Sequence, residues 1–111
     1  MEKSDEFEYR EKPEIVIRKH IIPKITNPEL KEAFENIAEE VERVQECANE
    51  CDIKGILTSY ELIGRETQKV LSKVGLSNKW IDLKRQIMRL ENIVQDTLKE
   101  KCKCNIKKRY W

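Results

Sequence analysis

Three long segments carry hydrophobic residues at alternating steps of three and four, the spacing of an amphipathic α-helix. The first segment keeps this spacing without a break through Leu30, Phe34, Ile37, Val41, Val44, Ala48 and Cys51. Asn27, Pro28 and Glu29 come just before it and suit the cap, the first position and the first turn of a helix. We therefore expect a helix over residues 28–51.

The phase of this pattern changes between Cys51 and Ile53, which predicts a turn at that point. A second helix is expected over residues 53–75, starting at Asp52 or nearer Thr58, and a third over 78–103. Gly75 suits the left-handed residue that ends a helix. The second helix carries Ile53, Ile56, Tyr60, Ile63, Thr67, Val70 and Val74, and the third carries Trp80, Leu83, Ile87, Leu90, Val94, Thr97 and Leu98.

The first 27 residues have a different pattern. Phe7 and Tyr9 alternate with charged residues, and Ile15 and Ile17 are again two positions apart, with charged residues on either side of the run. Alternation is typical of an extended strand, and the prolines at 13 and 23 exclude a central strand. We expect an extended N-terminal arm or one short edge strand.

These elements predict an all-α fold. Short connections make neighbouring helices antiparallel, so the simplest architecture is an up-down-up three-helix bundle with coiled-coil-like heptad packing. The 111 residues are enough for one domain. We divide them into an extended arm (1–27), the bundle (28–104) and a basic aromatic tail (105–111).

The net charge of the chain is +1, so it does not indicate whether a partner is acidic or basic. Its distribution is uneven: residues 29–52 carry nine acids and two bases, and residues 99–111 carry six bases and one acid. No signal peptide and no run of ~18 apolar residues is visible. We expect an intracellular, cytoplasmic protein without membrane contact.

Four cysteines form two pairs, Cys47 with Cys51 and Cys102 with Cys104. The first and third helices of the predicted bundle run parallel, which brings both pairs to the same end. Four thiolates in one place suit tetrahedral zinc, the one candidate cofactor. Buried or incidental thiols and a disulfide or redox pair are the alternatives, and reduced thiols are the rule inside cells.

The C-terminal end combines positive charge with aromatic rings. Phosphate contacts and base stacking need those two properties, so the end is a candidate nucleic-acid-binding segment. A solvated helix end is the competing interpretation, because lysines also offset the helix dipole. The candidate residues are Lys101, Lys103, Lys107, Lys108, Arg109, Tyr110 and Trp111.

No catalytic motif is present, and the chain has one histidine, so we expect no enzyme activity and name no catalytic residue. Ile81 and Met88 lie off the apolar stripe of their helix. They and the arm would form a second contact zone. The favoured hypothesis is a helical interaction protein, a small subunit or adaptor that binds another chain, itself or a different protein. The partner-binding candidates are Phe7, Tyr9, Ile15, Ile17, Ile81 and Met88.

Overall fold

The computed structural model describes residues 11–74 and 78–102, and within them the chain is helical with no strand. The prediction of an all-helical fold is confirmed for these residues. The α-helices are α2 (Pro13–Val16), α3 (Pro28–Asn49), α4 (Ile53–Val74) and α5 (Asn78–Thr97). Shorter helical turns follow two of them: η1 (Ile17–Ile21) and η2 (Ile22–Lys24) after α2, and η3 (Leu98–Cys102) after α5.

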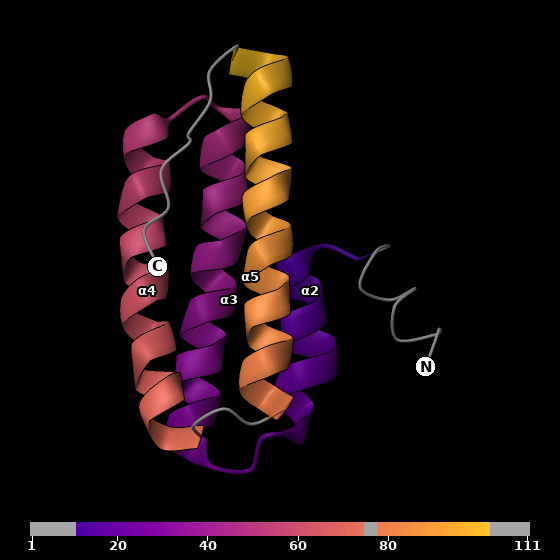
Figure 1. Cartoon of the computed structure of the whole chain (residues 1–111), viewed down its shortest axis with the longest axis vertical. Coiled ribbons are helices and arrows are strands. Elements are labelled where there is room, and N and C mark those ends of the chain that lie inside the picture. The colour runs from indigo at the N-terminus through magenta and orange to yellow at the C-terminus, as the bar shows by residue number, and fades with distance from the viewer. Residues whose placement is uncertain (1–10, 75–77, 103–111) are drawn as a thin grey trace.

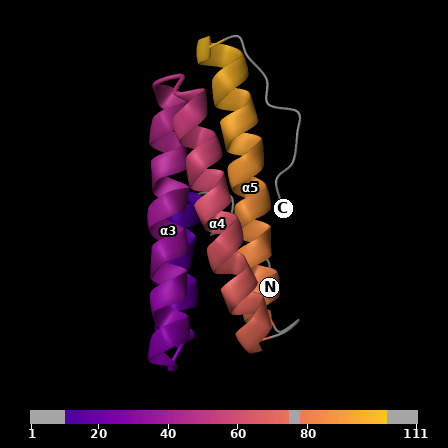
Figure 2. The same cartoon turned by 90° about the vertical axis from the view of Figure 1, so that its left-hand side faces the viewer.

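The three long helices lie side by side, with α3 and α5 running in one direction and α4 in the other (Figure 1). Their apolar stripes supply most of the core. On α3 every stripe position from Leu30 to Ala48 is buried, and Leu83 and Leu90 of α5 and Leu98 of η3 are fully buried. Figure 2 shows α4 inclined to both neighbours, and α4 packs far more extensively on α3 than on α5.

The start of α3 follows from its first residues. The side chain of Asn27 accepts a hydrogen bond from the backbone N–H of Leu30 at 3.1 Å, and Pro28 occupies the first helical position. This contact satisfies one of the backbone donors that have no partner inside the helix. At this same end of the bundle, Lys73 of α4 pairs with Glu29 at 2.9 Å and lowers the pKa of that carboxyl.

The turn between α3 and α4 ends α3 two residues before the predicted boundary. Cys51 takes a left-handed conformation with φ of 59°. Its N–H donates to the Ala48 carbonyl at 3.1 Å, and the N–H of Asp52 donates to the Cys47 carbonyl at 2.9 Å. This pair of bonds is the Schellman motif, in which glycine is the usual left-handed residue. Asp52 then caps α4 by accepting from the Gly55 N–H at 3.0 Å.

The N-terminal segment is the main departure from the sequence prediction. An extended arm is wrong for residues 13–24, which form α2, η1 and η2 and pack against α3 and α5. Figure 1 shows α2 on the side of α5 opposite α4. Burial explains the helical form, because a helix places the apolar side chains of this segment on one face. Those side chains are Val16, Ile17, Ile21 and Ile22.

None of the helices in the described ranges is long and apolar enough to cross a membrane.

Candidate functional site

The cysteine end of the molecule contains a disulfide. Cys51 and Cys102 are bonded, with their Cα atoms 5.7 Å apart, so the end of η3 is joined to the α3–α4 turn. That separation lies in the normal range for disulfides. Parallel α3 and α5 bring these two cysteines to one end, although the sequence interpretation favoured reduced thiols over a disulfide.

The disulfide changes the prospects of the predicted four-thiol zinc site. Two of its four proposed ligands, Cys51 and Cys102, are no longer thiols, and Cys104 lies outside the described residues. The described part of the chain also holds no group of three or more metal-ligating side chains. Among the described residues the arrangement is therefore a disulfide beside one thiol, Cys47.

Cys47 has the properties of an unreactive thiol. It is half-buried against the core. Burial, and then the nearby carboxylates of Asp52 and Glu50, raise the pKa of this thiol. A raised pKa lowers the fraction of thiolate at neutral pH, and the thiolate is the nucleophile and the metal ligand. Cys47 is thus poorly suited to catalysis.

Most of the predicted nucleic-acid segment lies outside the described residues. Lys103, Lys107, Lys108, Arg109, Tyr110 and Trp111 belong to that part of the chain. Lys101 is described, and its ammonium donates to the Asn49 side-chain oxygen at 3.1 Å. This contact links η3 to the end of α3, which is a structural role.

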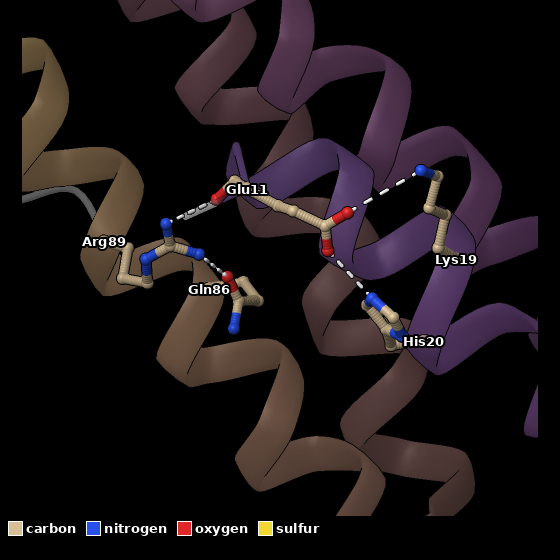
Figure 3. Close-up of polar contacts among 5 residues, drawn as sticks. All are labelled: Glu11, Lys19, His20, Gln86 and Arg89. Atoms are coloured by element: carbon tan, nitrogen blue, oxygen red, sulfur yellow. Dashed lines mark hydrogen bonds and ion pairs between the residues drawn. The ribbon is translucent and has the colours of Figure 1, made fainter. Parts of the chain in front are cut away.

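A polar network connects the N-terminal segment to α5 (Figure 3). The guanidinium of Arg89 donates to the backbone carbonyl of Glu11 and to the side-chain oxygen of Gln86, both at 2.6 Å. The Glu11 carboxylate points the other way, 2.8 Å from His20 Nε2 and 3.6 Å from the Lys19 ammonium (Figure 3). These residues position α2 on α5. The side-chain nitrogen of Gln86, buried in the same network, has no hydrogen-bond partner.

A groove between α4 and α5 combines apolar walls with charged side chains. It has a volume of about 480 Å³. Helix α4 lines it with Ile63, Thr67 and Gln68, and α5 lines it with Trp80, Lys84, Ile87, Met88 and Glu91. Most of the lining is apolar, which is typical of surfaces that bind ligands or partner chains.

Two side chains beside this groove are unusually exposed. Ile81 and Met88 are 47% and 54% exposed, and they are the large hydrophobic side chains left most open in the described ranges. They are seven residues apart, so they lie on one face of α5. Lys84 and Glu91 lie on the same face. Together the four positions 81, 84, 88 and 91 follow the three-four-three spacing of one side of a helix.

Glu91 also approaches the interior. Burial first, and then the negative charge of Glu91, raise the pKa of the Tyr60 phenol above its ordinary value. The phenol is therefore neutral throughout the physiological range and is not a general base. The groove offers apolar surface and two opposite charges, those of Lys84 and Glu91.

The other predicted partner-binding residues divide into three groups. Ile17 is fully buried, so assigning it to a partner surface is wrong, and Ile15 is half-buried. Phe7 and Tyr9 lie outside the described residues. Sequence reasoning did not find the α4 wall of the groove, because Thr67 and Ile63 belong to the core stripe of that helix.

Comparison with known proteins gives no relative: no family model, no curated protein and no solved structure matches this chain.

Proposed function

We propose that this chain is a non-enzymatic helical interaction protein, a small subunit or adaptor that binds another helical chain at the groove between α4 and α5. The exposed pair Ile81 and Met88 carries the proposal. Exposed apolar side chains beside a groove lower the free energy when a partner covers them, and amphipathic helices bind such grooves through residues one and two turns apart.

The proposal includes the way in which the three long helices pack on one another. The stripes of α3, α4 and α5 would interdigitate as in a coiled coil, with Leu30, Phe34 and Val41 facing apolar positions of the neighbouring helices. A helix seated at the groove would extend this packing by one more member. An intracellular location also belongs to the proposal, since it rests on sequence alone.

Site-specific photo-crosslinking tests the proposal. A benzophenone amino acid placed at position 88 in the native cells should give covalent adducts on irradiation, because a bound partner would lie against that side chain. The same amino acid at position 31, an exposed position on α3, is the matched control. Adducts at 88 in clear excess over 31 support the proposal. Equal or absent adducts at 88 contradict it.

A further inference from the structure

The partner that best fits this surface is a second copy of the same chain. We propose that two copies bind through their α4–α5 grooves, with the two α5 helices antiparallel and a two-fold axis at Met88. This inference rests on the proposed function and specifies the partner. The evidence is the order of charges and apolar groups along one face of α5.

The charges on this face are complementary to themselves when the face is reversed. Lys84 lies four residues before Met88 and Glu91 lies three residues after it, and both line the groove. At ~1.5 Å of rise per residue these offsets are about 6 Å and 4.5 Å. A two-fold axis at Met88 therefore brings Lys84 of one copy level with Glu91 of the other, to within about 1.5 Å along the helix.

The two-fold axis repeats the contact between Lys84 and Glu91. In a two-fold dimer each contact between two different positions is repeated by exchange of the copies, so two Lys84–Glu91 pairs would flank the centre. A parallel arrangement of the same faces would instead place Lys84 against Lys84 and Glu91 against Glu91. Repulsion between like charges therefore selects the antiparallel arrangement.

Apolar contact at the centre completes the fit. Met88 is more than half exposed and would meet its own copy on the axis. Methionine suits such a position because its unbranched side chain adapts to irregular surfaces. The grooves of the two copies would face each other there, which removes Trp80 and Ile87 further from water. Helix α2 does not cover this approach, since it lies across α5 from α4 (Figure 1).

A charge-exchange experiment tests the arrangement. The wild-type chain, with a mass of 13.3 kDa, is expected to sediment at twice that mass at about 100 µM. Lys84→Glu and Glu91→Lys each convert both flanking pairs to repulsion, so each variant alone should dissociate at least about tenfold more readily. An equimolar mixture of the two variants should recover wild-type affinity as a heterodimer, because every Lys–Glu pair is restored.

Three controls fix the interpretation. Lys31→Glu makes the same charge change on α3 and should leave dimerisation unchanged. Met88→Lys should abolish the dimer and keep the helical circular dichroism signal. Thermal melts of the Lys84 and Glu91 variants at a concentration where all are monomeric should match within a few degrees.

The inference is overturned if the wild type stays monomeric at several hundred micromolar, or if the mixed variants form no heterodimer. The proposed function is decided separately by the adducts at position 88. An adduct of twice the chain mass supports both statements. An adduct with a different protein supports the proposed function and overturns self-association through this face.

Discussion

The two glycines of α4 have very different surroundings. A Cβ atom added at Gly55 would lie 2.6 Å from Asp52 Oδ2 and 2.7 Å from Cys47 Sγ, whereas one added at Gly64 would meet nothing within 4 Å. The Asp52 side chain is also the cap of α4, bonded to the N–H of Gly55. Gly55 is therefore required by close packing at the α3–α4 turn, and Gly64 is not.

This contrast predicts opposite effects of the same substitution. Gly64→Ala should stabilise the fold by about 0.5–1 kcal/mol, because alanine loses less conformational entropy in a helix. Gly55→Ala should give no gain or a loss, since displacing the Asp52 cap costs about 1 kcal/mol. Urea unfolding of the two variants measures the difference. Equal stabilisation by both would contradict the described packing at Gly55.

At the scale of elements, the N-terminal segment belongs to the core. Ile17 is fully buried. Polar contacts with α3 stabilise the position of the segment: Gln45 donates to the Glu14 carboxylate at 2.6 Å, and Arg18 pairs with Glu42 at 2.9 Å. Truncation or substitution here should therefore act on the stability of the whole fold.

Ile17→Ala is expected to lower the free energy of unfolding by about 2–5 kcal/mol, because it removes buried methylene groups and leaves a cavity. Ile81→Ala removes the same atoms from an exposed position and should cost less than about 1 kcal/mol in the monomer. Chemical denaturation of both variants measures the two changes in the free energy of unfolding. A loss below 0.5 kcal/mol for Ile17→Ala would show that α2 and η1 lie outside the cooperative unit.

The long helices were predictable because their patterns are long. Seven stripe positions from Leu30 to Cys51 leave little doubt about the period, and all but Cys51 are buried. In the N-terminal segment the strand pattern rested on two short alternations, Phe7 with Tyr9 and Ile15 with Ile17, and only the second lies in the described residues. Positions 15 and 17 also fit a helix that continues to Ile21, so tertiary burial decided the conformation.

The candidate site was also only partly predictable from the sequence. The topology of the predicted helices placed the two cysteine pairs at one end, and the structure joins one member of each pair. Spacing along the chain does not determine whether thiols bind metal or oxidise. Nor does it reveal the groove, which depends on α4 inclining toward α3, a property of packing between helices.

At the scale of the whole molecule, the disulfide should contribute strongly to stability. It joins residues 51 positions apart, and restricting the unfolded chain by a loop of this length stabilises the fold by about 4 kcal/mol in the chain-entropy account. Reduction should lower the urea midpoint of unfolding accordingly. A midpoint that does not move with reductant would contradict the bond between Cys51 and Cys102.

The left-handed backbone at Cys51 provides a matched pair of reduced-state variants. Without the disulfide, Cys51→Gly with Cys102→Ser should be more stable than Cys51→Ser with Cys102→Ser by about 1 kcal/mol, because glycine adopts positive φ without steric cost. Equal stabilities would mean that residue 51 leaves this conformation once the bond is broken.

The disulfide also encloses α4 and α5 in a covalent ring, while α3 and α2 lie outside it. Tension applied between the two ends of the chain would pass through the disulfide, so the residues inside the ring would not be stretched. The bonded cysteines are 51 positions apart, and the bond therefore withholds about 170–180 Å of extended chain from the pulling force. A pulling force could thus peel away α2 and α3, while the two helices that form the groove remain tethered at their common end until a reductant releases them.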